Sequence, residues 1–93
     1  MPEPGRFKFL TSHALVLLAV DRQPDATVHE LARTVGLTDR QVHRVLDDLE
    51  EEGYITRELV GRRNEYTVNR HQPRHDSPYA GEEIEDLLAV LRG

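Results

Sequence analysis

The segment from residue 27 to residue 53 carries two sets of helix-start signals in close succession, and it restricts the fold more than any other part of the chain. Thr27 and Glu30 have the spacing of a capping box, in which a hydroxyl and a carboxylate each accept a hydrogen bond from a backbone N–H of the first turn. Thr38 and Gln41 repeat that spacing eleven residues later. The segment therefore predicts two helices separated by a tight turn.

Apolar residues repeat at the spacing of one helix face after each of these start signals. The first stripe is Val28, Leu31, Ala32 and Val35, and the second is Val42, Val45, Leu46 and Leu49. Gly36 and Gly53 follow the two stripes, and glycine adopts the left-handed conformation that ends a helix at low cost. We therefore predict a short helix that begins at Val28 and a longer helix that ends at Gly53.

The two predicted helices and the turn between them, called the corner below, resemble the helix-turn-helix of DNA-binding proteins. Ala32 is the small residue where the helices cross, Gly36 is the turn glycine, and Leu37 is the apolar residue that follows it. The resemblance implies that outward polar residues of the second helix meet base edges in the major groove. These residues are Thr38, Asp39, Arg40, Gln41, His43 and Arg44. The alternative is an ordinary helical corner whose outer side chains are only solvated.

After Gly53 the hydrophobic period changes from that of a helix to that of a strand. Residues 54–60 are rich in β-branched and aromatic side chains, residues 61–64 have the composition of a turn, and residues 65–68 alternate again. The sequence therefore predicts a β-hairpin directly after the helical corner.

The run LDDLEEEGYITRELVGRRNEYTV, residues 46–68, resembles the winged helix of MarR and ArsR-type bacterial and archaeal regulators, and the likeness extends from residue 12 to residue 68. It implies a mainly helical α+β fold, a three-helix bundle with a two-stranded hairpin wing, in a DNA-binding domain of residues 6–70. It also implies an inward-facing Tyr66 and a wing tip that contacts phosphates or the minor groove. That tip is Gly61, Arg62, Arg63 and Asn64. The alternative is a solvated turn whose charges prevent edge-to-edge aggregation.

Two further helices are predicted outside this core. Ser12 is a suitable N-cap for a first helix that is apolar on almost all sides, so it must be covered either by its own chain or by a second subunit. Residues 69–79 read as a linker or as a wrapped extended segment. A C-terminal amphipathic helix follows from residue 82, with a stripe of Ile84, Leu87, Leu88 and Leu91, so residues 71–93 comprise a linker and this helix. This stripe either packs on its own chain or crosses to a partner. We favour the partner, because terminal helices of the resembled family build the dimer.

Composition restricts the chemistry of the chain. Its 93 residues suffice for one small domain, and the lack of cysteine excludes a disulfide framework and thiolate metal sites. No long apolar run indicates a membrane segment, which favours a cytoplasmic protein. The five histidines lack the spacing of metal ligands, and no motif of an enzyme or of a cofactor site is present, so we predict no metal, no cofactor and no catalysis.

The formal net charge of −5 argues against a nonspecific nucleic-acid coat. The second half of the predicted recognition helix, DDLEEE, would repel a DNA backbone that came close. We therefore predict a homodimeric, sequence-specific regulator of double-stranded DNA, with residues 38–52 in the major groove and the wing on the backbone. The alternative function is a winged-helix protein-protein interaction module that does not bind DNA. No sequence feature locates a small-molecule effector.

Overall fold

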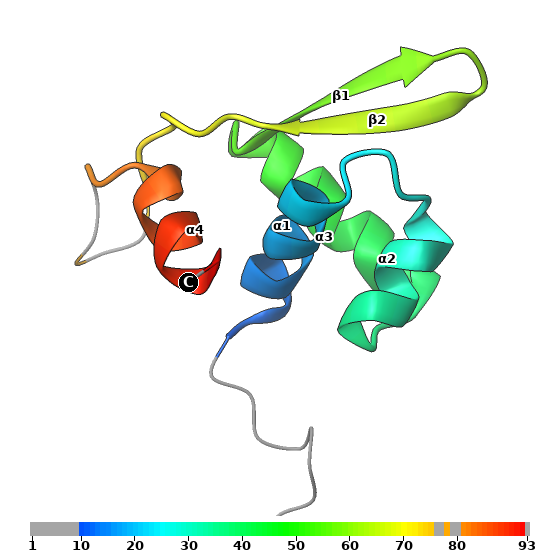
Figure 1. Ribbon diagram of the computed structural model, residues 1–93, viewed down its shortest axis with the longest axis horizontal. Coiled ribbons are helices and arrows are strands. Elements are labelled where there is room, and N and C mark those ends of the chain that lie inside the picture. The colour runs from blue at the N-terminus through cyan, green and yellow to red at the C-terminus, as the bar shows by residue number, and fades with distance from the viewer. Residues whose placement is uncertain (1–9, 76–77, 79–80, 93) are drawn as a thin grey trace, which may run out of the picture.

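The computed structural model describes residues 10–75, 78 and 81–92, and it confirms the predicted fold class (Figure 1). The elements are α1 (Ser12–Arg22), α2 (Val28–Val35), α3 (Asp39–Glu51), β1 (Ile55–Val60), β2 (Arg63–Val68) and α4 (Ile84–Arg92). Three helices carry a two-stranded antiparallel hairpin, called the wing below, and a fourth helix follows it. The first residues of the predicted domain, 6–9, lie outside the described part of the chain.

Both predicted capping boxes form. The Glu30 backbone N–H donates to Thr27 Oγ1 at 3.1 Å, and the Thr27 N–H donates to Glu30 Oε1 at 3.2 Å. The hydrogen bond from the Thr27 backbone holds the pKa of Glu30 below its ordinary value. The N–H of Thr38 and that of Gln41 make the equivalent pair of bonds at 2.9 and 3.1 Å. Gly36 has a φ of 74°, so the predicted left-handed turn between α2 and α3 is confirmed.

The first helix begins one residue earlier than predicted. Thr11, not Ser12, is the N-cap of α1, and its hydroxyl accepts a hydrogen bond from the Ala14 N–H at 3.2 Å. Both residue types can cap a helix. The backbone of Thr11 is extended, as a cap requires, and this allows Ser12 to become the first helical residue.

The core of the domain surrounds α1. In Figure 1, α1 lies between α4 on one side and the α2–α3 pair on the other. Val16, Leu17, Ala19 and Val20 are buried. The other buried side chains come from the turn before α2, from all three remaining helices and from both strands: Ala26, Leu31, Ala32, Val42, Val45, Leu46, Leu49, Ile55, Tyr66, Val68, Ile84 and Leu88. The chain itself therefore covers much of α1, while Ala14, Leu15 and Leu18 stay half-buried.

The wing turns more tightly than predicted. Its strands pair in one continuous register from Ile55 opposite Val68 to Val60 opposite Arg63, which leaves two residues in the turn. Gly61 supplies the positive φ, 65°, that a two-residue hairpin turn needs to match the twist of its strands. Arg63 and Asn64 are therefore residues of β2, not of the tip. Tyr66 is buried, as predicted.

The last helix begins at Ile84, two residues later than predicted, and half of its stripe packs on its own chain. Ile84 and Leu88 are buried in the same core as α1, which corrects our preference for a partner at these two positions. Leu87 and Leu91 are half-buried, and Val90 is 76% exposed.

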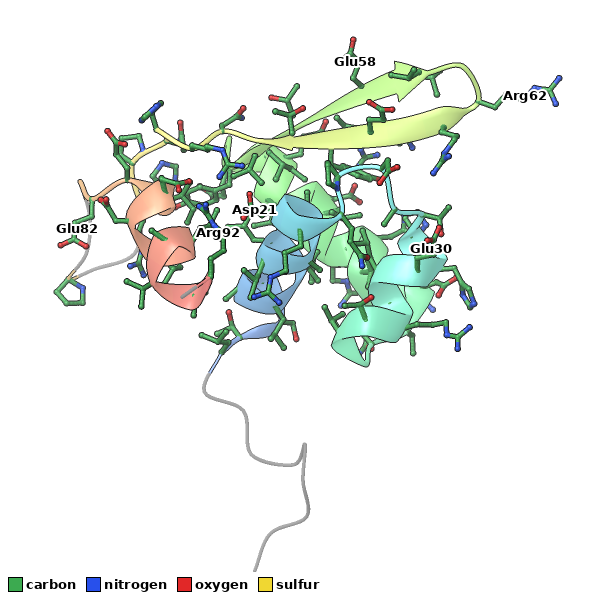
Figure 2. The ribbon with its side chains drawn as sticks, viewed as in Figure 1. Asp21, Glu30, Glu58, Arg62, Glu82 and Arg92 are labelled. Carbon is green, nitrogen blue, oxygen red and sulfur yellow. The ribbon has the colours of Figure 1, made fainter. Side chains whose placement is uncertain are left out.

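An ion network called the Asp21 cluster fixes α4 beside the end of α1. The Asp21 side chain is 3% exposed and pairs with Arg70 at 2.7 Å and with Arg92 at 3.1 Å. Both arginines also pair with Glu85 of α4. Figure 2 shows Arg92 reaching from α4 toward Asp21. These contacts hold the pKa of Glu85 below its ordinary value, through the hydrogen bond from Arg70 first and that from Arg92 second.

Hydrogen bonds join the segment before α4 to Tyr54, which follows α3, and to the start of α4. The Asn69 N–H donates to the Tyr54 carbonyl at 2.9 Å, and the Ile84 N–H donates to the Gln72 carbonyl at 2.9 Å. The His75 N–H donates to the Tyr54 hydroxyl at 2.7 Å. Of the two interpretations of this stretch, a linker or a wrapped extended segment, its described residues fit the second. None of the helices described here is long and apolar enough to span a bilayer.

Candidate nucleic-acid interface

The six predicted base-reading residues all lie exposed at the start of α3, but they are not equivalent. Thr38 Oγ1 and Gln41 Oε1 form the capping box, so these atoms already hold the first turn of the helix. Asp39 pairs with His29 of α2, with 3.2 Å between the Asp39 Oδ1 and the His29 Nδ1 atoms. These three residues therefore orient the helix as well as facing solvent.

The other three predicted residues of α3 project without an internal partner. Arg40, His43 and Arg44 make no hydrogen bond or ion pair with any residue in the described ranges, and all three are exposed. Arg40 and Arg44 are four residues apart, so they share one face of the helix. This face presents two guanidinium groups and one imidazole to solvent in the first two turns of α3.

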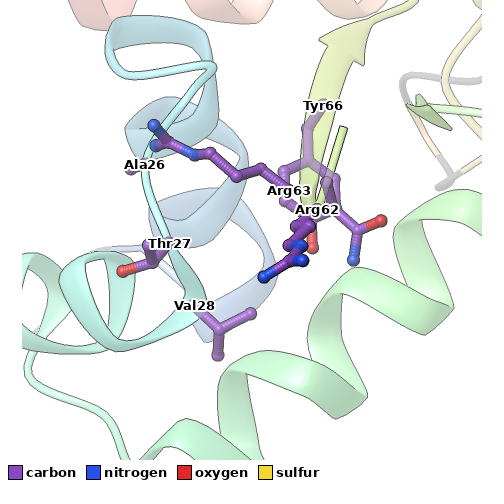
Figure 3. A pocket seen from close by; sticks show the side chains of 7 residues that line it. Ala26, Thr27, Val28, Arg62, Arg63 and Tyr66 are labelled. Atoms are coloured by element: carbon purple, nitrogen blue, oxygen red, sulfur yellow. The ribbon is translucent and has the colours of Figure 1, made fainter. Parts of the chain in front are cut away.

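The two wing arginines also differ from each other. Arg62 lies in the turn, and Figure 2 shows it pointing away from the body of the molecule. Arg63 instead donates from its guanidinium to the Asp25 carbonyl, before α2. With Asn64 and Tyr66, both arginines border a hollow of about 190 Å³ beside the start of α2 (Figure 3). One arginine is thus directed outward, and the other holds the wing to the α1–α2 turn.

The acidic second half of α3 is largely paired within the molecule. The Asp47 carboxylate accepts from the Arg57 guanidinium at 2.9 Å, and Glu50 lies 3.6 Å from the same group. Asp48 pairs with His13 at 2.8 Å, and Glu52 pairs with His75 at 2.7 Å. The repulsion predicted for this half is therefore weakened by neighbouring donors.

The structure places the predicted site residues on two separate elements. No described hydrogen bond or ion pair joins the residues of the wing tip to the exposed residues of α3. Within the described ranges, no group of three or more His, Asp or Glu side chains is arranged to hold a metal ion.

Comparison with known proteins agrees with this architecture. A model described as MarR family matches residues 9–63, more than half of the chain. This chain belongs to the MarR family. Members of the family are transcriptional regulators and not enzymes, so the chain is a transcriptional regulator.

A solved structure resembles the chain in fold. It is the crystal structure of a predicted DNA-binding transcriptional regulator from E. coli, with a TM-score of 0.61 and 20% sequence identity. The match covers 84% of this chain and 70% of that one. No curated protein sequence matches the chain.

The MarR-family match ends at Arg63, the first residue of β2. The rest of β2, the segment after it and the whole of α4 lie beyond the matched residues. The Asp21 cluster therefore joins a residue inside the matched region to Arg70, Glu85 and Arg92 outside it.

Sequence reasoning missed two of the groups that organise this MarR-family structure. Arg57 was not singled out, although it lies two residues after the inward-facing Ile55 and so on the same face of β1. That alternation could have identified it. Asp21 and Arg70 are 49 residues apart, and no local pattern connects them.

Proposed function

We propose that this regulator binds double-stranded DNA in a sequence-specific manner, with α3 in the major groove. The observation that carries the proposal is the exposed group Arg40, His43 and Arg44, which has no described internal partner. Arginine offers paired donors that match the O6 and N7 acceptors of guanine. The capping-box residues Thr38 and Gln41, together with Asp39, hold the start of α3 and lie close enough to the groove to add contacts of their own.

The wing supplies affinity in this proposal and little sequence preference. Arg62 lies on a solvated turn, where its charge can neutralise a phosphate and release a counterion. Arg63 and Asn64 lie one and two residues further along, in β2, and the Arg63 guanidinium already donates to the Asp25 carbonyl. In this proposal they therefore contact the backbone less directly than Arg62 does.

The functional unit in this proposal is a homodimer. Val90 is 76% exposed, and Leu87 and Leu91 beside it are half-buried, so α4 keeps an apolar face after Ile84 and Leu88 are packed. Residues 71–93 would then form the dimerisation element. Two recognition helices related by a two-fold axis read half-sites about 34 Å apart on one face of DNA. Pairing also raises the effective concentration of the second docking surface.

Selection of bound sequences from a random DNA pool tests the central claim. A sequence-specific regulator enriches a near-palindrome with half-sites about one helical turn apart. Changing a base-reading arginine, Arg40→Ala or Arg44→Ala, should then cost about 1–3 kcal/mol on the selected site and much less on random DNA. Glu58→Gln, at an exposed residue of β1, is a control for a charge change outside α3. A pool that enriches no sequence contradicts sequence-specific binding.

Salt dependence tests the wing. Arg62→Ala should lower the salt slope of binding by about one, because one phosphate contact is lost. Arg63→Ala should lower it less, since its guanidinium already donates to the Asp25 carbonyl. Equal slopes for Arg62→Ala and the parent protein would remove the wing from the interface.

Light scattering tests the dimer. Val90→Asp places a charge on the exposed face of α4 and spares the buried residues, so it should give a folded monomer with weaker DNA binding. Glu82→Gln, at an exposed residue outside the α4 face, is the matched control. A parent protein that is monomeric at micromolar concentration refutes the dimer.

A protein-interaction module remains the second candidate function. It is favoured by the net charge of −5 and by the acidic residues gathered at the end of α3. It predicts that the pool selection fails while the folded protein binds a basic protein partner.

A further inference from the structure

Arg57 links the wing to the recognition helix. It lies on β1 opposite Tyr66, and its guanidinium carbon is 5.7 Å from the centre of the Tyr66 ring. The same guanidinium donates to Asp47 at 2.9 Å and lies 3.6 Å from Glu50. Asp47 and Glu50 are three residues apart on α3, so one side chain from the wing contacts two acids on a single helix face.

The Arg57 side chain is largely buried in this contact. It is 28% exposed, and its Nε atom is buried without a hydrogen-bond partner among the described residues. The hydrogen bond to Asp47 raises the pKa of Arg57 above its ordinary value. A guanidinium held in this way directs its charge to α3 and away from solvent.

No other described side chain makes an ion pair between the wing and α3. The remaining ties of the wing lead elsewhere: the Tyr66 N–H donates to the Pro24 carbonyl at 3.2 Å, and Arg63 donates to the Asp25 carbonyl. These bonds fix the wing to the α1–α2 turn. Its angle to the recognition helix depends on the covalent connection through residues 52–54, on the packing of the buried strand residues Ile55, Tyr66 and Val68 in the shared core, and on the ion pairs of Arg57.

We propose that Arg57 is a positioning residue for DNA binding, which fixes the wing relative to α3 so that Arg62 and the base-reading face engage the same duplex. This inference rests on the proposed DNA-binding function. Arg57 acts through Asp47 and Glu50 and does not itself contact DNA. Its loss should therefore uncouple the wing from the site without deleting any side chain that contacts DNA.

Positioning and simple charge give opposite expectations for the partners of Arg57. Asp47→Asn with Glu50→Gln removes two negative charges from the recognition helix, which by charge alone strengthens binding to any DNA. If Arg57 positions the wing through these acids, the same double variant instead weakens binding to DNA, because the phosphate contact of the wing is lost. The matched control is Glu58→Gln, which removes a negative charge from β1, the strand that carries Arg57. Figure 2 shows Glu58 pointing away from α3.

A double-mutant cycle with Arg62→Ala measures the coupling. In the parent chain Arg62→Ala should lower the salt slope by about one. In the Arg57→Met chain, and in the Asp47→Asn, Glu50→Gln chain, Arg62→Ala should leave the slope almost unchanged, because the wing no longer reaches its phosphate. Arg57→Lys keeps a charge that can pair with Asp47 and should restore part of the coupling.

The possible outcomes separate the two proposals. If Arg62→Ala lowers the slope equally in every background, Arg57 does not position the wing, although the protein still binds DNA. If the parent chain binds no DNA, the proposed function fails, and the positioning role fails with it. Thermal unfolding by circular dichroism identifies any variant that does not fold. The Asp47→Asn, Glu50→Gln chain retains Arg57, so it provides the same readout if Arg57→Met is unfolded.

Discussion

The α2–α3 corner and the α4 region are held by different kinds of interaction. In the corner, each helix begins at a capping box formed by residues three apart, and α2 ends at a glycine that follows it directly. The α4 region is held by Arg70 and Arg92 converging on Asp21, which is 49 residues before Arg70. The corner is specified by neighbours in sequence, whereas the position of α4 is specified by contacts between distant parts of the chain.

This difference predicts that the two regions open with different free energies. A helix of nine residues is marginal alone in water, so α4 depends on its docking contacts for its structure. The corner packs its apolar stripes into the centre of the core. We therefore expect α4 to undock with a lower free energy than the corner needs to unfold.

Two leucine truncations should show the largest effect. Leu46→Ala, in α3, and Leu88→Ala, in α4, each remove a fully buried side chain, and such changes cost about 2–5 kcal/mol. Leu46→Ala should lower the free energy of unfolding of the whole domain, as measured by chemical denaturation. The loss from Leu88→Ala should be limited to the docking free energy of α4, with amide exchange accelerated in α4 and little changed in α3. Equal acceleration in both helices would show that α4 unfolds together with the corner.

Loss of the Asp21 carboxylate should have the next largest effect. Asp21→Asn replaces the buried carboxylate between Arg70 and Arg92 with a neutral amide, and a hydrogen bond to a charged group contributes about 1.5–3 kcal/mol. Amide exchange should accelerate in α4. Glu82→Gln, at an exposed acid outside the cluster, should leave exchange unchanged. If the two variants behave alike, the cluster does not hold α4.

Removing a cap from the corner should cost less. Thr38→Ala deletes the hydroxyl that accepts from the Gln41 N–H, which should lower the free energy of unfolding by about 1 kcal/mol. Thr38→Ser keeps the hydroxyl and is the control. Because the cap belongs to the central core, the loss should appear in global unfolding and not only in local exchange. A Thr38→Ala protein as stable as the Thr38→Ser protein would show that the cap adds nothing.

The smallest effect should come from pH. The hydrogen bond to Glu83 raises the pKa of His71 above its ordinary value of about 6.5. The folded state therefore binds this proton more tightly than the unfolded state. The resulting stabilisation is fully present below about pH 6.5 and is lost as the pH rises through the folded-state pKa. Titration of the His71 ring by NMR should give a raised pKa that returns toward the ordinary value in Glu83→Gln.

The same contrast explains what could be predicted from the sequence. Both capping boxes and the turn at Gly36 were predicted correctly, because each depends on residues within one or two turns of a helix. The inward position of Tyr66 was implied by the resemblance to the winged helix, and its burial confirms it. The buried half of the α4 stripe was assigned to a partner, because periodicity identifies an apolar face and not the surface that covers it.

The recognition face illustrates the same limit. The exposed positions of Arg40 and Arg44 follow from helical spacing alone. The distinction between Arg62, which points outward, and Arg63, which donates to the Asp25 carbonyl, depends on the tightness of the wing turn and on a residue 38 positions earlier. Composition and motif treat the two arginines as one pair, and only their three-dimensional surroundings separate them.

Because the turn at Gly61 has only two residues, the length of the wing is set by the number of residues in its paired strands and changes in fixed steps. Each residue added to both strands lengthens the hairpin by about 3.4 Å and also turns the tip to the opposite face of the ribbon. The tip keeps its orientation only when residues are inserted in pairs, which move it outward by about 7 Å at a time. Insertion or deletion in β1 and β2 therefore changes the spacing between wing and groove in steps larger than the length of a hydrogen bond. Fine adjustment is left to the angle at the base of the hairpin, where a single substitution can act.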